Sequence, residues 1–155
     1  MSQLTATTAT PRQEASKAAD SRHIETIDPA DVRPWRYHNR TGSGMDEASL
    51  GDLTNSILRE GQQQPGLARR LPSGDTHQVE AIFGVRRLEA CRRAGVRWRA
   101  EVVEESVSDA WCAAQMHSEN EWTERVSPLE NALQWKPMLA AGVVPNQAAL
   151  ARALG

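Results

Sequence analysis

The hydrophobic positions of the chain follow a strand period in some segments and a helical period in others. Between 96 and 103, apolar and polar residues alternate, which predicts a half-buried strand. Within 46–60, Leu50, Leu53 and Ile57 share one helical face, and Gly61 follows as a C-terminal stop signal. The pattern therefore predicts strands and helices within one folded region.

Turn residues and capping signals divide the rest of the chain into elements. A Pro-Ser-Gly-Asp turn at 72–75 separates two apolar runs and predicts a β-hairpin. The segment 127–130 is a capping box with proline at the first helical position. The expected elements are, in chain order, a strand and turn over 24–32, a loop over 33–44, a helix over 46–60, strands over 64–70 and 77–83, a helix from 84 to about 94, a strand over 96–103, and helices over 108–117, from 128 onward and over 147–154.

This order predicts the fold class α+β. Residues 23–105 are expected to form a small mixed α/β domain, and residues 106–155 a helical segment. Residues 1–22 are rich in Ser, Thr, Ala and Gln and hold no aromatic residue, so we expect a disordered tail there. The chain has no signal-peptide core and no apolar run long enough for a membrane span, which predicts a cytoplasmic protein without membrane contact.

Charge and cysteine content narrow the expected chemistry. The formal net charge is −2, but arginine outnumbers lysine sixteen to two. Six arginines cluster along a short segment: Arg86, Arg87, Arg92, Arg93, Arg97 and Arg99. A planar guanidinium suits phosphate better than an ammonium group does. Cys91 and Cys112 form no metal motif and are expected to be small buried hydrophobes.

The junction at Gly84 is a candidate anion site. A predicted strand passes through this glycine directly into a helix whose first turn carries Arg86 and Arg87. Glycine allows close approach of a ligand to the backbone, and a helix N-terminus favours an anion. The alternative is a solvated basic helix face in which the glycine only makes a turn.

A second candidate site is the pair Glu119-Asn120, expected in a loop just after a helix. A carboxylate beside an amide suits a hydrated Mg²⁺ and a phosphate oxygen. The alternative is two polar residues of a connecting loop.

Four segments in this order and spacing resemble the N-terminal region of the ParB plasmid and chromosome partition family. The first, 56–65, carries Gly61 and Gln64-Pro65, and its Gly-Gln-Gln run is similar to plasmid-borne members. The second, 84–95, is similar to the arginine box of the family. The third joins Glu119-Asn120 to the capping box, and the fourth, 144–155, resembles the opening of a helix-turn-helix in which the chain then ends.

The resemblance implies a ParB/sulfiredoxin-like fold that binds CTP with Mg²⁺, and a homodimer that closes as a nucleotide-gated clamp on DNA. It implies that Gly84, Arg86 and Arg87 hold the triphosphate and that Glu119 and Asn120 hold Mg²⁺ and phosphate. Gly61, Gln64 and Pro65 would lie near the base and ribose. The family also implies a ParA-type ATPase partner for the N-terminal tail, whose cations are Arg12, Lys17 and Arg22. Arg40 matches a further position of the family.

The chain departs from the family pattern at three points. Val85 stands where many members have glutamate, so we expect CTP binding with weak or absent hydrolysis. Thr123 replaces the usual arginine of the third motif. The recognition helix is missing from this chain, so only nonspecific, salt-sensitive DNA binding is expected of it.

Two other functions remain open at this point. The same fold machinery could serve a transcriptional regulator, which sequence alone does not separate from partition. The fold is also shared by enzymes. A sulfiredoxin-like reaction needs a cysteine in the Gly84–Arg87 turn, a nuclease needs clustered carboxylates, and a ParB-fold kinase is the third enzyme alternative.

Overall fold

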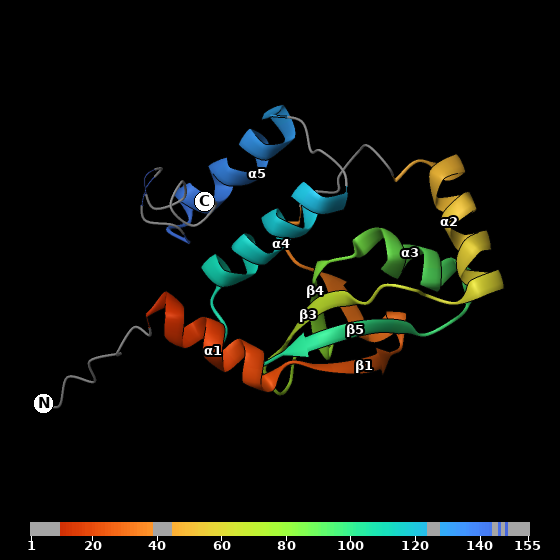
Figure 1. Cartoon of the computed structure of the whole chain (residues 1–155), viewed down its shortest axis with the longest axis horizontal. Coiled ribbons are helices and arrows are strands. Elements are labelled where there is room, and N and C mark those ends of the chain that lie inside the picture. Colours follow the sequence, from red (N-terminus) through yellow and green to blue (C-terminus); the bar gives the residue numbers. More distant parts are fainter. Residues whose placement is uncertain (1–9, 39–44, 124–127, 144–145, 147, 149–155) are drawn as a thin grey trace, which may run out of the picture.

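The structure is a computed structural model that describes residues 10–38, 45–123, 128–143, 146 and 148. Its centre is one five-stranded mixed sheet with helices on both faces (Figure 1). The spatial order of the strands is β1-β5-β3-β4-β2. They span His23–Ile27 (β1), Val32–Pro34 (β2), Gly66–Arg70 (β3), Val79–Phe83 (β4) and Trp98–Val103 (β5).

The sheet pairs both neighbouring and distant segments. β3 and β4 form the antiparallel hairpin expected across the 72–75 turn, with an irregular register between Leu67 and Ala68. β5 runs parallel to β3, with Gly66 opposite Ala100, and antiparallel to β1. β2 pairs in parallel with β4 after the short 3-10 turn η1, Pro29–Asp31. The mixed sheet with its helices is the expected α+β fold.

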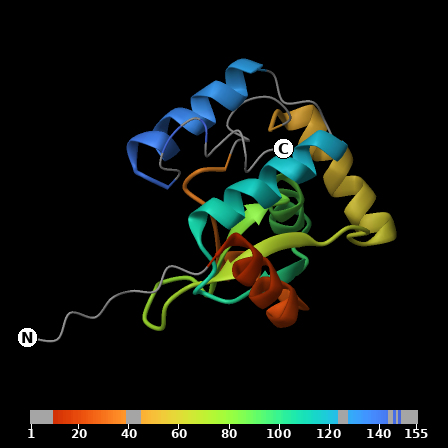
Figure 2. The ribbon, with the colours of Figure 1, turned by 60° about the vertical axis from the view of Figure 1, so that its left-hand side comes forward.

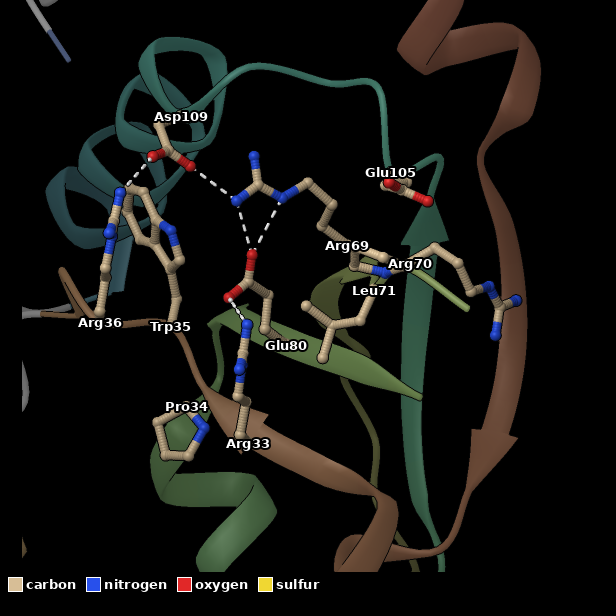
Figure 3. Close-up of a pocket in the computed structure, with 11 residues that line it drawn as sticks. Arg33, Pro34, Trp35, Arg36, Arg69, Arg70, Leu71, Glu80, Glu105 and Asp109 are labelled. Atoms are coloured by element: carbon tan, nitrogen blue, oxygen red, sulfur yellow. Dashed lines mark hydrogen bonds and ion pairs between the residues drawn. The ribbon is translucent and has the colours of Figure 1, made fainter. Parts of the chain in front are cut away.

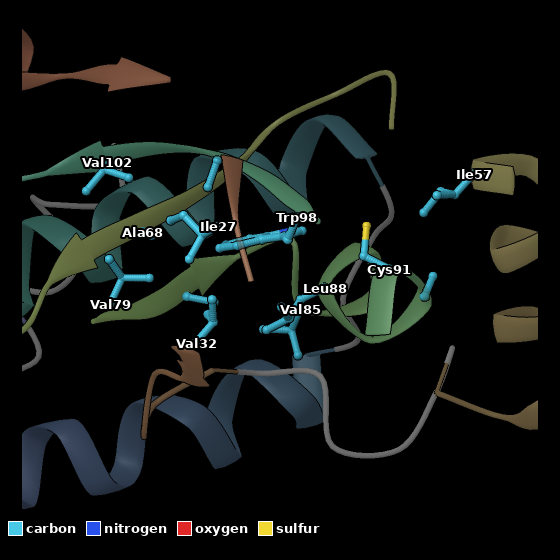
Figure 4. Packing of buried hydrophobic residues seen from close by; sticks show 13 residues of the cluster. Ile27, Val32, Ile57, Ala68, Val79, Val85, Leu88, Cys91, Trp98 and Val102 are labelled. Carbon is cyan, nitrogen blue, oxygen red and sulfur yellow. The ribbon is translucent and has the colours of Figure 1, made fainter. Parts of the chain in front are cut away.

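Alternating side chains divide the core into two layers. On one face, Leu67, Ile82 and Val103 pack with residues of α1 (Pro11–Ser21), α4 (Asp109–Thr123) and α5 (Pro128–Ala140). On the other face, their neighbours Ala68 and Ala81 pack against α3 (Val85–Ala94) and α2 (Glu47–Glu60), as Figure 4 shows for the second layer. The rotated view in Figure 2 shows α4 lying across the sheet with α1 beside one of its ends.

The expectation of a disordered tail is wrong for residues 11–21, which form helix α1. Thr10 and Gln13 make a capping box, with proline at the start of the helix. Ala18 is fully buried in the core layer shared with α4. Composition does not indicate this helix, because one buried alanine and a good cap anchor an otherwise polar segment. Residues 1–9 lie outside the described residues.

Helix α4 is longer than predicted and corrects the placement of the second candidate site. We expected its end near 117, but the helix runs from Asp109 to Thr123. Glu119 and Asn120 therefore lie within a helix and not in a loop. Cys112, Ala113 and Met116 pack on the sheet, so the packing continues past the predicted domain boundary at 105.

Several other predictions are confirmed. Asp46 caps α2, which buries Leu50 and Ile57 and ends at Gly61. Both cysteines are buried and free. Helix α5 begins at Pro128 as expected, whereas Ser127, Arg40 and most of the predicted helix-turn-helix lie outside the described residues. No helix in the described part of the chain is long and apolar enough to cross a membrane.

Candidate functional site

The candidate site is built around the turn that leads from β4 into α3. Gly84 is the N-cap of α3, with φ 84° and ψ 20°, and no side chain caps this helix. In an α-helix, the N–H groups of the first turn have no intrahelical acceptor and point along the axis toward a possible anion. The turn is therefore suited to a phosphate.

A second glycine allows the backbone to pass close to this turn. A Cβ on Gly84 would lie 3.0 Å from the Cα of Gly66, and a Cβ on Gly66 would lie 2.2 Å from the Trp98 ring. Gly84 also has a positive φ, which strains any other residue. Gly66 was not identified from the sequence. Its signal is its place directly after Gln64-Pro65, at the start of a buried strand.

The Arg87 guanidinium joins three of the predicted segments. Its Nη1 donates to the carbonyl oxygens of Pro65 at 2.8 Å and Gln64 at 3.2 Å. Its Nη2 donates to Glu119 Oε1 on α4 at 2.8 Å. The side chains of Arg87 and Glu119 are only 17% and 18% exposed. A single cation thus connects α3, the loop before β3 and α4, in a setting where screening by water is weak.

The other predicted site residues do not all lie at the Arg87 guanidinium. Arg86 turns to α2, where its Nη2 donates to Ser49 Oγ. Gly61 ends α2 and begins the loop that carries Gln64. Asn120 follows Glu119 in α4, but its side chain lies outside the described residues. The structure therefore brings together Gly84, Arg87, Glu119 and the backbone of Gln64-Pro65, whereas a joint role of Arg86 and Arg87 stays a prediction.

Val85 contributes no polar group to this site. It is 6% exposed and packs in the core layer with Leu88 and Ala90. A buried aliphatic side chain has no group that could take up or deliver a proton.

Metal-binding groups do not cluster densely in the described part of the chain. No group of three or more His, Cys, Asp or Glu side chains there could hold an ion. Glu119 is nevertheless the type of hard oxygen ligand that Mg²⁺ uses together with phosphate oxygens and water. Glu119 therefore suits a Mg²⁺ ion that is also bound by the phosphate oxygens of a ligand better than a Mg²⁺ ion bound by protein side chains alone.

The surroundings of Cys91 do not suit a sulfiredoxin-like reaction. Cys91 is fully buried, and burial raises its pKa to about 11, so it is a poor nucleophile for sulfiredoxin-like chemistry.

The three cations proposed for a partner contact differ in their surroundings. Arg22 pairs with Glu101 at 3.1 Å, donates to Gln115 at 3.3 Å and stacks over Trp111. It thus fixes α1 to the domain. Lys17 is exposed on α1, and the side chain of Arg12 lies outside the described residues.

A cavity of about 580 Å³ lies at the opposite end of α4 (Figure 3). Its centre is Arg69, which donates to Glu80 Oε1 at 2.5 and 3.0 Å and to Asp109 Oδ1 at 2.6 Å. Burial opposes the charge of Arg69, but its interactions with Cys112, Glu80 and Asp109 outweigh burial and raise its pKa. Arg33 and Arg36 pair with the same two carboxylates from the rim. These ion pairs join β3 and β4 to the first turn of α4, so their role is structural.

Comparison with known proteins identifies related sequences and structures. A family model described as the ParB N-terminal domain matches residues 13–120. Stage 0 sporulation protein J of Bacillus subtilis is 32% identical over 116 residues, which are 75% of this chain but 39% of that protein. The chain thus spans about two fifths of this relative.

Two solved structures of a C-terminally truncated chromosome-partitioning protein ParB from Caulobacter crescentus share the fold. The one complexed with CTP-gamma-S matches with a TM-score of 0.53 and 25% identity, covering 85% of this chain and 71% of that one. The one complexed to the centromeric parS site matches with a TM-score of 0.52 and 23% identity, covering 84% and 64%.

Proposed function

The chain belongs to the ParB family, and from this premise we propose that it is the CTP-binding module of a DNA-partition protein. In this proposal the turn at Gly84, together with Arg87 and Glu119, binds the triphosphate of CTP with Mg²⁺. The nucleotide controls closure of two such modules into a clamp on DNA.

The observation that carries the proposal is the convergence on Arg87. Two segments that are 22 to 32 residues distant from Arg87 in sequence, Gln64-Pro65 and Glu119, meet at its guanidinium. Through the carbonyl oxygens of Gln64 and Pro65, Arg87 also fixes the loop expected near the base and ribose. It stands beside a glycine-capped helix N-terminus, which adds a favourable field for an anion.

Each residue has a distinct part in the proposed binding. The first-turn N–H groups after Gly84 and the Arg87 guanidinium would donate to phosphate oxygens. Glu119 would accept Mg²⁺ in exchange for part of its pairing with Arg87, and Asn120 is its proposed co-ligand. Mg²⁺, when bound, neutralises charge on the phosphates and orients them. Gln64 and Pro65 would border the base and ribose.

The proposed activity is binding rather than rapid turnover. Val85 is buried where a family member would offer a carboxylate, so no side chain at this position can activate water. CTP would therefore act as a slowly released or slowly hydrolysed switch ligand.

Partners follow from the same premise. The ParB relative complexed to the centromeric parS site supports DNA as the partner. Clamp closure between two copies of the chain is a further part of the proposal. The exposed face of α1 with Lys17 is the proposed contact for a ParA-type ATPase, because Arg22 is already paired within the domain.

Isothermal titration with CTP, UTP, ATP and GTP tests the proposal, each with Mg²⁺ and with or without nonspecific DNA. We expect CTP to bind more tightly than the other three by roughly tenfold or more, the difference that about one good hydrogen bond makes. Equal affinity for all four nucleotides, or no binding of any, would rule out a CTP-specific module.

A further inference from the structure

Gln62 is absent from the predicted site, yet its side chain holds the loop that the site depends on. Its Nε2 donates to the carbonyl oxygen of Gln64 at 2.8 Å and to that of Arg99 at 2.7 Å. Its Oε1 accepts from the backbone N–H of Arg99 at 2.7 Å and from Cys91 Sγ at 3.5 Å. All hydrogen-bonding groups of this amide are thus engaged.

The bonds to Arg99 imitate a strand partner. β3 begins at Gly66 opposite Ala100, so Arg99 lies one residue before the part of β5 that pairs with β3, while it pairs with Thr26 of β1 on its other side. The Gln62 amide takes both backbone groups of Arg99, as a neighbouring strand would. This extends the ladder beyond the first residue of β3 and fixes the loop against β5.

The bond from Gln62 to the Gln64 carbonyl links the Gln62 amide to the proposed nucleotide site. The Gln64 carbonyl that accepts from Gln62 also accepts from Arg87 Nη1 at 3.2 Å. Arg99 Nη2 donates to the adjacent Gln63 carbonyl at 3.0 Å, so the loop backbone is held from two sides. The orientation of the carbonyls that meet Arg87 therefore depends on Gln62.

We propose that Gln62 is a positioning residue that sets the 61–65 loop, and through it Arg87, in the geometry that binds the nucleotide. It touches no ligand in this proposal, which rests on the proposed CTP function. Preorganisation of this kind raises affinity because the loop need not be ordered on binding.

The test compares Gln62→Ala and Gln62→Glu with the neighbouring control Gln63→Ala. Gln63 Nε2 makes a single bond in the described structure, to the carbonyl of Glu60 at 2.6 Å, and none toward Arg87 or β5. Gln62→Glu keeps an acceptor for the Arg99 N–H but loses both donated bonds. Three quantities are measured: CTP affinity by titration, the ratio of CTP to UTP affinity, and amide hydrogen exchange at Arg99.

We expect Gln62→Ala and Gln62→Glu to weaken CTP binding by roughly tenfold, with a changed CTP to UTP ratio, whereas Gln63→Ala stays within about twofold. Hydrogen exchange at the Arg99 amide should become faster in Gln62→Ala than in the wild type. In Gln62→Glu it should be slower than in Gln62→Ala, because an acceptor remains, and in Gln63→Ala it should equal that of the wild type. If both Gln62 variants bind CTP like the wild type, Gln62 does not position the site. A wild-type protein that binds no CTP instead overturns the proposed function, while the exchange at Arg99 still tests the anchor.

Discussion

Two arginines join the sheet region to opposite ends of α4. Arg69 of β3 meets Asp109 in the first turn of the helix, and Arg87 of α3 meets Glu119 ten positions later, roughly 15 Å along the axis. Both side chains are largely buried, at 14% and 17% exposure. Arg69 binds two carboxylates, whereas Arg87 binds one carboxylate and two neutral carbonyl oxygens. We infer from this difference that Arg69 is structural and that Arg87 belongs to the ligand site.

The guanidinium of Arg69 is already engaged within the fold, and Arg33 and Arg36 pair with its two carboxylates from the rim. Glu80 and Asp109 both bind its guanidinium, and its remaining Nη1 donates to the carbonyl of Val107 at 2.7 Å. An incoming anion would have to displace these partners from Arg69. Arg87 has one carboxylate and two neutral carbonyls, beside a helix N-terminus. An anion at the Arg87 end would compete with Glu119 for the guanidinium, and the neighbouring helix N-terminus favours its charge.

The largest effect is expected from removing Arg69. Arg69→Met would leave Glu80, which is 5% exposed, without its main partner, and should lower the free energy of unfolding by about 3–5 kcal/mol. Urea denaturation measures this loss. The double variant Arg69→Met with Glu80→Leu should regain most of it and bind CTP within about twofold of wild type. A double variant that stays folded but binds no CTP would contradict the assignment of stability to the Arg69 end of α4 and of ligand binding to the Arg87 end.

Removing Arg87 should affect binding more than stability. Arg87→Ala loses a charge-assisted contact and should weaken CTP binding by about 1.5–3 kcal/mol, roughly ten- to a hundredfold. Its loss of unfolding free energy should be smaller than that of Arg69→Met. Titration and urea denaturation measure the two quantities. Arg93→Ala, which removes a surface arginine of the same helix, is the control and should leave affinity unchanged.

The contrast between Arg69 and Arg87 could not be predicted from the sequence. The glycine and the arginines of the 84–87 turn were identified because strand period, glycine and helix signal are local features. The bonds of Arg87 to Gln64 and Pro65 depend on how β3 passes the turn at Gly66, which is a tertiary feature. Composition likewise gave no sign that Arg69, and not another arginine, would be buried with two carboxylates.

The errors in the element boundaries have similar causes. The polar run around Glu119 was interpreted as a loop, yet helix α4 continues through it, because the apolar residues that anchor this helix on the sheet lie upstream, at Cys112 and Met116. The polar composition of residues 1–22 does not indicate helix α1, which begins after the N-cap Thr10. In both cases contacts with distant residues decide a segment whose local pattern is weak.

Asp109 and Glu119, two carboxylates of α4, offer a finer test. Glu119→Gln preserves size and an acceptor for Arg87 but removes the proposed Mg²⁺ ligand, so the gain in CTP affinity on adding Mg²⁺ should fall by roughly tenfold. Asp109→Asn changes a carboxylate on the same helix at the Arg69 end and should leave this gain intact. Titrations at several Mg²⁺ concentrations distinguish the two. An equal response of both variants would place the metal elsewhere.

The smallest effect is expected at the rim of the Arg69 cavity. Arg36 is 69% exposed and pairs with Asp109 at 3.2 Å. Arg36→Ala should cost less than about 1 kcal/mol of unfolding free energy, because water and salt screen exposed pairs. Urea denaturation at low and high salt measures it. A loss as large as that of Arg69→Met would mean that the rim, and not the buried pair, carries the stability of this end.

The central claim is that the Arg87 end of α4 is a triphosphate site, and a crystal structure with Mg²⁺ and a nonhydrolysable CTP analogue tests it most directly. We predict phosphate oxygens within hydrogen-bonding distance of Arg87 and of the first turn of α3, with the metal at Glu119. Nucleotide bound in the Arg69 cavity, or bound elsewhere while the Arg87–Glu119 pair stays intact, would contradict the account.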